Sequence, residues 1–332
     1  MAKNRILAVI EDLLAQAGID PDQVADAAPL AGGTFNNVSR VTLTNGQRLI
    51  LKAAPDIPTL TYEWRILRTE ALYYELAGPH RNVPAVIHTG FDAHNDAADF
   101  ILMTEIPGNP WPSVADRLAD GQRQNLRRDL GRIVAGLHSI TGTGFGYPAR
   151  PLMASWRAAF RGMVEDVLAD GDRYGAVLLP RPPGEIYDAM TAHESVLDEV
   201  TTPVLVHFDL WDGNILVDFD DAGSPRIGGL IDAERAFWGD PLAEFVSLAL
   251  LADINDDPAF LTGYRDAGGP ASLDASSRIR LALYNVYLYL IMLIEAEPRG
   301  FGAAQREWLQ RRVAPALTAE LEVLEFPREA GG

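Results

Sequence analysis

The sequence predicts an α+β fold of two lobes, a small one built on an antiparallel sheet and a larger α-helical one. Apolar and polar residues alternate at 38–43 and 48–53 around a polar turn, which is typical of a β-hairpin. Beyond the breaker Pro107-Gly108-Asn109-Pro110, apolar residues recur at helical spacing. A chain of 332 residues is also long for a single core. We therefore assign residues 1–106 to the small lobe and residues 107–332 to the large lobe.

The small lobe should contain two helices and further strands. Residues 3–17 carry apolar side chains at helical spacing, which predicts an N-terminal helix. A second helix is expected at 61–76, because Gly78-Pro79 would end it. Two apolar runs, 83–89 and 100–105, predict strands that are separated by a polar turn.

The large lobe should be mainly helical. The clearest amphipathic helix is expected at 123–140, and residues 155–200 predict further helices that are interrupted by a turn at 180–184. The segment 204–232 is the exception, because its short apolar runs predict strands. Three more helical segments complete the lobe: 241–251, 274–296 and 303–324.

Composition restricts the class of protein. The chain has no cysteine, which excludes disulfides, thiolate catalysis and cysteine-bound metals. No apolar run reaches the roughly 18 residues of a membrane span, and residues 1–17 lack the pattern of a secretory signal, so we expect a cytoplasmic protein. A net charge of -18 argues against nucleic acid or an anionic membrane as a partner. The acidic large lobe would attract a cationic small molecule, although solubility alone also explains its charge.

One lysine is unusual in its position. Lys3 and Lys52 are the only lysines among 28 basic residues, yet Lys52 lies inside an apolar strand. A buried ammonium group needs an anionic partner, and a lysine is a compact point charge that suits a phosphate. The helix that follows offers Glu63 and Glu70 as carboxylates that would fix Lys52. We favour Glu70, because the helix around it is regular and flanked by apolar residues.

The segment 206–218 carries the most specific pattern in the chain. It holds His207, Asp209 and Asn214 as His-x-Asp-x-x-x-x-Asn, and Asp232 follows a second apolar run. Phosphoryl transfer to a hydroxyl needs such a set, because one carboxylate accepts the hydroxyl proton while an amide and a second carboxylate hold magnesium. We therefore predict that Asp209 is the catalytic base and that Asn214 and Asp232 bind Mg²⁺.

The same residues have simpler interpretations. Asp209 would otherwise cap a turn, and an Asn after Gly213 is common in turns of any kind. Asp232 at the end of a buried strand would be costly without a partner, which favours metal binding. His207 is interpreted as a structural residue that hydrogen-bonds to the backbone near Asp232, since Asp209 already serves as the base.

A small polar stretch lies between two β segments, directly before the hairpin. Its sequence is Gly32-Gly33-Thr34-Phe35-Asn36-Asn37, and its small residues let backbone N–H groups approach phosphates. A plain hairpin would have the same composition. Because the stretch precedes Lys52 by about one hairpin, we take Gly33, Thr34 and Asn36 as candidates for nucleotide binding.

Together these motifs resemble the aminoglycoside phosphotransferase family, which phosphorylates small molecules and has a protein-kinase-like fold. The resemblance covers roughly residues 30–251 and rests on Lys52, on the segment 206–218, and on Gly229–Glu234 running into Gly239–Glu244. It implies that Lys52 contacts the phosphates of ATP or GTP and that Mg²⁺ is the metal cofactor. It also implies that the connector ending in Glu105 and Ile106 meets the adenine through its backbone.

Two features depart from the usual family pattern. Phe208 stands where the family usually has Gly between the His and the base. The tripeptide Asp209-Leu210-Trp211 is similar to the Asp-Leu-Trp sequence of the fructosamine-kinase branch. Only seven residues separate Asp232 from Asp240, which is too few for an activation loop with a peptide-docking platform. The acceptor should therefore be a small molecule, and Asp240 should be part of the scaffold.

The resemblance implies a hydroxyl acceptor that is small and cationic, such as an aminoglycoside or another antibiotic. A metabolic acceptor, such as a fructosamine, an amino sugar or an amino alcohol, is the alternative. The acids that could bind an amine are, in chain order, Asp253, Asp256, Asp257, Glu295 and Glu297. Each of them is equally interpreted as a solvated surface charge.

Two other classes of protein stay open. One is a nucleotide-binding pseudokinase without transferase activity, which the joint presence of Lys52, Asp209, Asn214 and Asp232 opposes. The other is a metal-dependent hydrolase that would use His207 and Asp209 as ligands, and the six histidines show no clustering that favours it. The sequence does not determine the oligomeric state.

Overall fold

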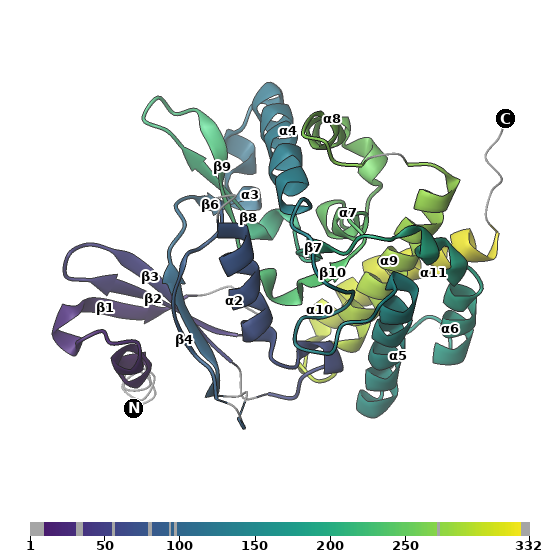
Figure 1. Cartoon of the computed structure of the whole chain (residues 1–332), viewed down its shortest axis with the longest axis horizontal. Helices are drawn as coiled ribbons and strands as arrows, with labels where there is room; N and C mark the ends of the chain where they lie inside the picture. Colours follow the sequence, from purple (N-terminus) through teal and green to yellow (C-terminus); the bar gives the residue numbers. More distant parts are fainter. Residues whose placement is uncertain are drawn as a thin grey trace.

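The fold has a small lobe built on an antiparallel sheet and a larger, mainly helical lobe, which is the predicted α+β class (Figure 1). The computed structural model describes residues 10–30, 36–54, 57–78, 82–92, 94–95, 98–270 and 273–326. The N-terminal helix expected at 3–17 lies partly outside these residues, and the described part is helical from residue 10 to residue 16. The predicted lobe boundary after residue 106 falls in the connection between two strands that belong to different sheets.

The small lobe is an antiparallel five-stranded sheet in the order β1-β2-β3-β5-β4. Its strands are β1 (Val24–Pro29), β2 (Asn37–Leu43), β3 (Arg48–Ala53), β4 (Val86–Gly90) and β5 (Phe100–Thr104). The predicted hairpin is confirmed as β2 and β3, with Val38 opposite Lys52. Helix α2 (Ile66–Ala77) joins β3 to β4, and the 3-10 turns η1 (Pro21–Gln23) and η2 (Thr61–Glu63) precede β1 and α2.

Helix α2 begins later than the sequence predicts. The expected start was residue 61, but Thr61–Glu63 form a 3-10 turn and Arg65 adopts a left-handed conformation with φ of 57°. A non-glycine residue in this conformation interrupts the helical path, so the regular helix starts at Ile66. The N-terminal helix packs on the sheet through Ile10 and Leu14, which form a small separate core with residues of β2, β3 and β5.

The large lobe contains most of the helices and two small sheets. Its helices are α3 (Trp111–Val114), α4 (Asp120–Leu137), α5 (Trp156–Tyr174), α6 (Pro183–Thr191), α7 (Ala243–Leu248), α8 (Pro258–Asp266), α9 (Ala275–Ile294), α10 (Ala303–Trp308) and α11 (Ala314–Glu325). The strands β6 (Asn109–Pro110), β8 (Ile215–Phe219) and β9 (Pro225–Leu230) form one sheet, and β10 (Phe237–Gly239) pairs with β7 (Val204–Val206). The short 3-10 or π turns are η5 (Ala115–Arg117), η6 (Glu194–Glu199), η7 (Asp212–Asn214), η8 (Ala233–Arg235), η9 (Ile254–Asp256) and η10 (Leu309–Val313).

Helices α4 and α8 pack directly against each other at two glycines. A Cβ atom at Gly131 would lie 2.3 Å from the carbonyl oxygen of Phe260, and one at Gly263 would lie 1.9 Å from that of Arg128. No larger residue fits at either position without a shift of the backbone. The sequence analysis missed α8, because a nine-residue helix that contains a glycine has too few apolar positions to show a period.

Helix α9 is the central helix of the large lobe. Among the described residues it is the one helix long and apolar enough to cross a membrane, and 67% of its most apolar stretch is buried inside the fold. Tyr284 and Tyr287 are fully buried on it and fill the core of the lobe. Tyr284 donates a hydrogen bond of 2.7 Å to Asp240, and Arg280 pairs with the same carboxylate at 2.8 Å. Asp240 therefore holds the helix in place.

Candidate active site

The catalytic loop runs from β7 to η7 and carries Asp209. Asn214 donates its side-chain N–H to the Asp209 carbonyl oxygen at 2.8 Å, and a longer contact of 3.3 Å reaches the Asp209 carboxylate. Burial raises the pKa of Asp209 to about 7, and the guanidinium of Arg235 works against this rise. A carboxyl group with a pKa near neutrality can take and return a proton at physiological pH.

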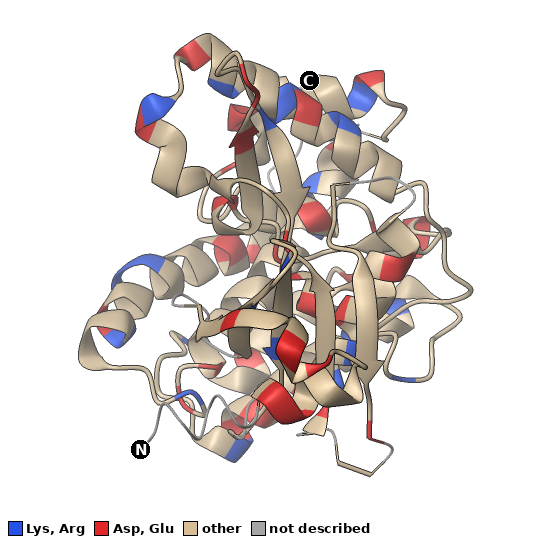
Figure 2. Ribbon diagram, turned by 90° about the vertical axis from the view of Figure 1, so that its left-hand side faces the viewer, with Lys and Arg blue, Asp and Glu red and all other residues tan. Residues whose placement is uncertain are grey.

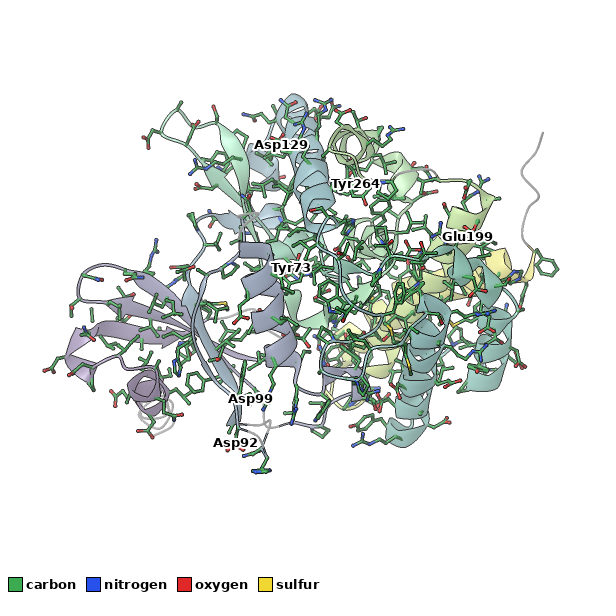
Figure 3. The ribbon with its side chains drawn as sticks, viewed as in Figure 1. Tyr73, Asp92, Asp99, Asp129, Glu199 and Tyr264 are labelled. Carbon is green, nitrogen blue, oxygen red and sulfur yellow. The ribbon has the colours of Figure 1, made fainter. Side chains whose placement is uncertain are left out.

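His207 ties the catalytic loop to the segment before Asp232. Its Nε2 donates to the carbonyl oxygen of Ile231 at 3.0 Å, and its Nδ1 accepts the Asp209 backbone N–H at 3.3 Å. The Ile231 N–H in turn donates to the Asn214 carbonyl oxygen at 3.0 Å. Burial lowers the pKa of His207, and the ring of Tyr73 (labelled in Figure 3) packs edge-on against the imidazole. His207 is thus a neutral residue whose two nitrogens are both occupied.

Helix α7 holds the other side of the catalytic loop. Both carboxylate oxygens of Glu244 accept backbone N–H groups, from His207 at 2.8 Å and from Phe208 at 3.0 Å. The Ser247 hydroxyl accepts the Leu210 N–H at 3.0 Å. Burial alone would raise the pKa of Glu244, but the nearby His138 and His207 and the backbone N–H group of His207 hold it below its ordinary value. Glu244 is therefore an ionised anchor for the loop.

Phe208 adopts a backbone conformation that favours glycine. Its φ is 61°, in the left-handed region, and its side chain is completely buried. The ring packs against Phe237 and Tyr287, with centroids 5.0 and 5.7 Å away. The structure thus explains why a glycine suits this position and what the phenylalanine contributes in its place.

Lys52 lies between three carboxylates from both lobes. Its Nζ is 2.7 Å from Glu70 and 2.8 Å from Glu234, and it also pairs with Asp232. Burial opposes the ammonium charge, but the three carboxylates together raise the pKa of Lys52 above its ordinary value. Glu63, the other candidate partner, pairs with Arg299 instead. Lys52 and Glu70 are held by the small lobe, while Asp232 and Glu234 follow β9 in the large lobe.

Two hydrogen bonds through Tyr74 complete this cluster. The hydroxyl of Tyr74 donates to Glu70 at 2.9 Å and accepts the Asp232 N–H at 2.8 Å. Burial would raise the pKa of Asp232, but Lys52 holds it below its ordinary value. Burial raises the pKa of Glu234 to about 8, against the opposing effect of Lys52. Glu234 is thus partly protonated at neutral pH, and Asp232 is ionised.

The donors in this cluster fit Mg²⁺. Oxygen atoms of Glu70, Asp232 and Glu234 lie within 4.8 Å of one another. Asn214 uses its amide nitrogen to bind Asp209, which leaves its amide oxygen for a cation. Carboxylate and amide oxygens are the ligands that Mg²⁺ takes in nucleotide sites. Asp232 and Asn214, the two predicted ligands, lie on segments that the Ile231–Asn214 bond joins.

The remaining nucleotide-site candidates fall around this cluster. Gly33 and Thr34 lie outside the described residues, whereas Asn36 is buried and donates to Glu234. Glu105 pairs with Arg40 and Arg48 at 2.6 and 3.1 Å, so its side chain is engaged in the sheet. Among the described residues, neither the N–H nor the carbonyl oxygen of Ile106 has a hydrogen-bond partner. The Ile106 backbone is therefore available to a base at the junction of the lobes.

Ile106 also explains a glycine in β9. A Cβ atom at Gly229 would lie 2.5 Å from Cγ2 of Ile106 and 3.0 Å from the carbonyl oxygen of Asn82. The connector between the lobes therefore packs directly on the strand that leads to Asp232.

The five predicted substrate acids are not gathered at one place. Glu295 pairs with Arg235 at 3.0 Å and with Arg299 at 3.2 Å. Glu297 pairs with Arg306 at 2.7 Å, and Asp257 caps α8 and pairs with Arg127. Asp253 caps η9, and Asp256 is exposed in the same turn. Of the five, Glu295 alone connects to Asp209, through Arg235.

Sequence reasoning assigned no role to three buried charged residues of the site, namely Glu234, Arg235 and Glu244. Nη1 of Arg235 lies 3.8 Å from Asp209, which places a positive charge beside the carboxylate without a direct hydrogen bond. One signal was present in the sequence: Asp232, Glu234 and Arg235 fall within four positions directly after an apolar strand. Charges so close to a buried strand must find partners, which suggests a site.

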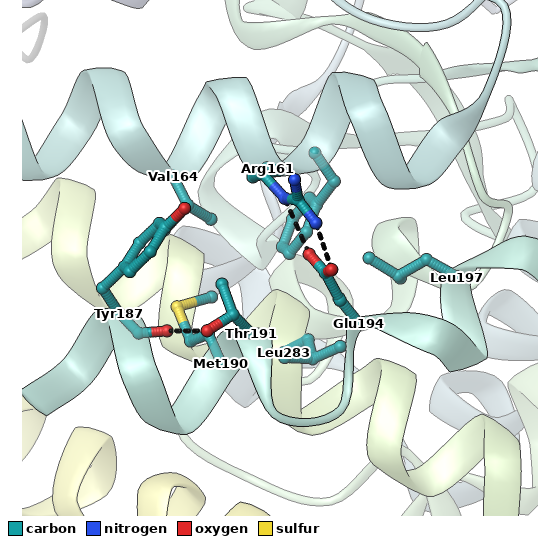
Figure 4. A pocket seen from close by; sticks show the side chains of 9 residues that line it. Arg161, Val164, Tyr187, Met190, Thr191, Glu194, Leu197 and Leu283 are labelled. Carbon is teal, nitrogen blue, oxygen red and sulfur yellow. Dashed lines mark hydrogen bonds and ion pairs between the residues drawn. The ribbon is translucent and has the colours of Figure 1, made fainter.

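A separate hollow lies between α5, α6, η6 and α9 (Figure 4). Its walls are mainly apolar, with Phe160, Met190 and Leu283 among them. Its charged residues Arg161 and Glu194 are paired with each other. The hollow therefore contributes no group that would move a phosphoryl group.

Comparison with known proteins identifies relatives of the same architecture. The model of the phosphotransferase enzyme family matches residues 26–281. No curated protein sequence matches the chain. Among solved structures, one assigned as a fructosamine-3-kinase from Thermobifida fusca has a TM-score of 0.61 and 23% identity, and the match covers 89% of this chain and 94% of that one.

Two further structures extend this comparison. A macrolide 2'-phosphotransferase from Brachybacterium faecium has a TM-score of 0.57 and 22% identity, with 98% of this chain and 99% of that one covered. A variant of aminoglycoside phosphotransferase APH(4)-Ia, in complex with ADP and hygromycin B, has a TM-score of 0.61 and 17% identity, with 93% and 98% covered. These likenesses show the fold.

Proposed function

The chain belongs to the phosphotransferase enzyme family and is a small-molecule kinase, and from this premise we propose that it transfers the γ-phosphoryl group of ATP to a hydroxyl of a small organic acceptor. One observation carries the proposal: the two bonds through Ile231 hold the segment of Asp232 against the loop of Asp209 and Asn214. Asp209, as the proposed base, and Asn214 and Asp232, as the proposed metal ligands, therefore lie on adjoining segments, and Asp232 contacts Lys52.

The nucleotide would lie between the lobes. Lys52, fixed by Glu70, would contact the phosphates as a point charge. The backbone groups of Ile106, which have no hydrogen-bond partner among the described residues, would bind the base. Mg²⁺, held by Asp232 and Asn214, would neutralise charge on the phosphates. GTP would meet the same backbone groups, so the assay compares both nucleotides.

Asp209 would act on the acceptor. Its carboxylate orients the acceptor hydroxyl and accepts the proton, while the hydroxyl oxygen forms a bond to the γ-phosphorus. The bond from that phosphorus to the bridging oxygen breaks, and ADP leaves with the electron pair. Arg235 keeps the pKa of Asp209 from rising further, which keeps a fraction of the base ionised at neutral pH.

The family indicates a small hydroxyl compound as the acceptor and does not specify its class. The relatives named above are described as acting on fructosamine, macrolide or aminoglycoside compounds, all of which carry hydroxyl groups. An antibiotic acceptor and a metabolic acceptor are both compatible with the site as described.

The other two classes are less favoured. A hydrolase that uses His207 as a metal ligand is opposed by the geometry, because both imidazole nitrogens are occupied by backbone groups. A pseudokinase would not require Asp209, Asn214 and Asp232 to be kept in register by Ile231 and Glu244.

A coupled assay of ADP release tests the proposal. The acceptor panel spans aminoglycosides, macrolides, fructosamines, amino sugars and amino alcohols, each with Mg-ATP or Mg-GTP. We expect at least one acceptor to stimulate ADP release, and the stimulation should vanish in Asp209→Asn. Stimulation that persists in Asp209→Asn would contradict the proposed base, and tight ATP binding without turnover of any acceptor would favour the pseudokinase.

A further inference from the structure

A chain of ion pairs with alternating charges extends from Asp209 to Glu63, which lies in η2 just before α2. Arg235 lies 3.8 Å from Asp209 and 3.0 Å from Glu295, and Arg299 lies 3.2 Å from Glu295 and also pairs with Glu63. We call these five residues the charge ladder. It joins the catalytic loop, η8, the end of α9 and η2, which are far apart in the sequence.

The charge ladder is buried and nearly neutral. The side chains of Glu63, Arg235, Glu295 and Arg299 are at most 9% exposed, while that of Asp209 is 20% exposed. Three carboxylates face two guanidinium groups, so the single unit of excess negative charge equals that of the catalytic base. The base itself must stay available to the acceptor hydroxyl, which leaves no spare carboxylate for an amine.

The nucleotide side of the site has the opposite balance. There, one ammonium group, Lys52, faces the three carboxylates Glu70, Asp232 and Glu234. This excess of negative charge suits a divalent cation. The carboxylates around Lys52 would therefore bind the metal ion, and they would not be available to an amine of the acceptor.

Other acids of the large lobe also have arginine partners. Asp212, which follows Asp209 in the loop, lies 3.2 Å from Arg127, and Arg127 also pairs with Asp257. Glu297 is held by Arg306 through two bonds of 2.7 and 2.9 Å. The chain is strongly acidic as a whole, but its acids are spread over both lobes with arginines among them (Figure 2). A polyamine needs unpaired carboxylates near its amines, and a desolvated amine without one is costly.

An uncharged acceptor would find a different kind of contact. Trp211, two residues after the base, is 42% exposed although it is a large apolar side chain. Its indole lies close over Gly213, where a Cβ atom would be 2.2 Å from the ring. The indole thus packs over Gly213 in the loop that carries Asp209, and ring-shaped ligands with apolar faces stack on such a surface.

We infer that the acceptor is a hydroxyl compound with no more than one positive charge, such as a neutral sugar derivative or a macrolide-like ring, and not a polyamine. This inference rests on the proposed function, since it places the acceptor at Asp209. The charge ladder supplies its physical basis, because it removes Glu295 and Glu63 from contact with amines.

Matched probes that share a ring skeleton and differ in charge through N-acetylation test the inference. Kanamycin A and its fully N-acetylated derivative share their ring skeleton, and glucosamine and N-acetylglucosamine form a smaller pair. Binding to the enzyme loaded with Mg-AMP-PNP is measured by calorimetry, and kcat/KM is measured with Mg-ATP. We expect the acetylated member of each pair to bind and react at least as well as the amine, and kanamycin A to show no saturable binding. Saturable binding of kanamycin A that weakens in Glu295→Gln would overturn the inference.

A gain of binding gives a second test. Arg299→Met frees Glu63 and leaves Glu295 with one guanidinium partner, so saturable binding of kanamycin A should appear where the wild-type enzyme shows none. Arg299→Gln serves if the methionine variant unfolds. The matched control is Arg161→Met, which breaks the exposed pair with Glu194 and should leave the affinity unchanged. No gain in either folded Arg299 variant would contradict the role of the charge ladder.

The experiments distinguish a failure of the proposed function from a failure of the inference about the acceptor's charge. If no acceptor reacts while Mg-AMP-PNP binds, the proposed function fails, and the kanamycin A isotherms still decide the charge preference. If a polyamine reacts best and its reaction depends on Asp209, the proposed function holds and the inference is overturned.

Discussion

Phe208 combines a strained backbone with a well-packed side chain. A left-handed conformation costs a non-glycine residue about 1–2 kcal/mol, whereas removing a buried phenylalanine ring costs about 3–5 kcal/mol. Packing therefore outweighs strain, which explains how this chain keeps a bulky residue next to Asp209, the proposed base.

The strain at Phe208 can be isolated with two substitutions. Phe208→Gly loses the ring but relieves the backbone, and should lower the free energy of unfolding by about 2–3 kcal/mol. Phe208→Ala loses the ring and keeps a Cβ atom at a φ of 61°, so it should be less stable than Phe208→Gly by about 1 kcal/mol. Urea unfolding measures both. An alanine variant as stable as the glycine variant would show that the position is unstrained.

The pH dependence of the reaction reports on Asp209. Its pKa is raised to about 7 by burial, and the base must be deprotonated to accept a proton. We therefore expect kcat/KM to rise with pH and to reach half its maximum near pH 7. Arg235→Gln removes the charge that lowers this pKa, so the rise should move to higher pH by about one unit, which corresponds to ~1.4 kcal/mol. Arg161→Met is the control, and an unmoved profile in Arg235→Gln would contradict the assignment.

Among the elements, the short helix α7 fixes the backbone of the loop that carries Asp209. It has six residues, yet Glu244 and Ser247 together accept the N–H groups of His207, Phe208 and Leu210. Catalytic loops need such fixed partners, because a shift of about 1 Å in a reacting group can cost ~100-fold in rate. The loop is thus placed by a helix that lies about 35 positions later in the sequence.

Removing this anchor should reduce both stability and turnover. Glu244→Ala leaves two buried N–H groups without acceptors, so the free energy of unfolding should fall by about 2–4 kcal/mol. Because Lys52 and Asp232 are untouched, kcat should fall while the Kd for Mg-AMP-PNP stays close to that of the wild type. Ser247→Ala removes a single acceptor and should show a smaller loss of both quantities. A nucleotide affinity that falls in parallel with kcat would indicate general unfolding instead.

At the scale of the whole molecule, the two lobes meet through opposite charges. Lys52 of the small lobe bridges Asp232 and Glu234 of the large lobe, and Asn36 also donates to Glu234. The three carboxylates around one ammonium group leave an excess of negative charge that a divalent cation would neutralise.

This arrangement predicts a Mg²⁺-dependent gain in stability. Mg-AMP-PNP at 100 times its Kd should stabilise the protein by about 2.7 kcal/mol, seen as a rise in Tm. The same nucleotide without Mg²⁺ should give a smaller rise. In Asp232→Ala the Mg²⁺-dependent part should disappear, while Asp209→Asn should keep it. Differential scanning calorimetry measures all four conditions, and an unchanged Mg²⁺ effect in Asp232→Ala would contradict the metal assignment.

The sequence predicted those parts of the molecule that are encoded locally. The hairpin of β2 and β3 follows from alternation around a turn, and the strand-then-helix order placed Lys52 near Glu70. Strand β1 was missed because its sequence, VADAAP, has no apolar alternation and includes a proline.

The catalytic motif was likewise recognisable because its residues are contiguous. The partners of buried charges were not, since Arg235 and Glu295 lie 60 positions apart and meet only when α9 packs against η8. For this reason the sequence analysis proposed Glu295 as an acid that binds a substrate amine, whereas in the structure Glu295 forms an ion pair with Arg235. Periodicity describes which face of an element is buried, but it does not specify which charge a buried residue will meet.

The most direct test of the central claim follows the phosphoryl group itself. The enzyme is incubated with ATP labelled at the γ-phosphate, Mg²⁺ and the best acceptor of the panel, and the products are identified by mass spectrometry and ³¹P NMR. We predict a phosphate ester on an acceptor hydroxyl together with an equal amount of ADP, and Asp209→Asn should bind Mg-ATP normally while its rate falls by about 10²–10⁴-fold. Label that appears only as inorganic phosphate, or an ester formed at an unchanged rate by Asp209→Asn, would contradict the account.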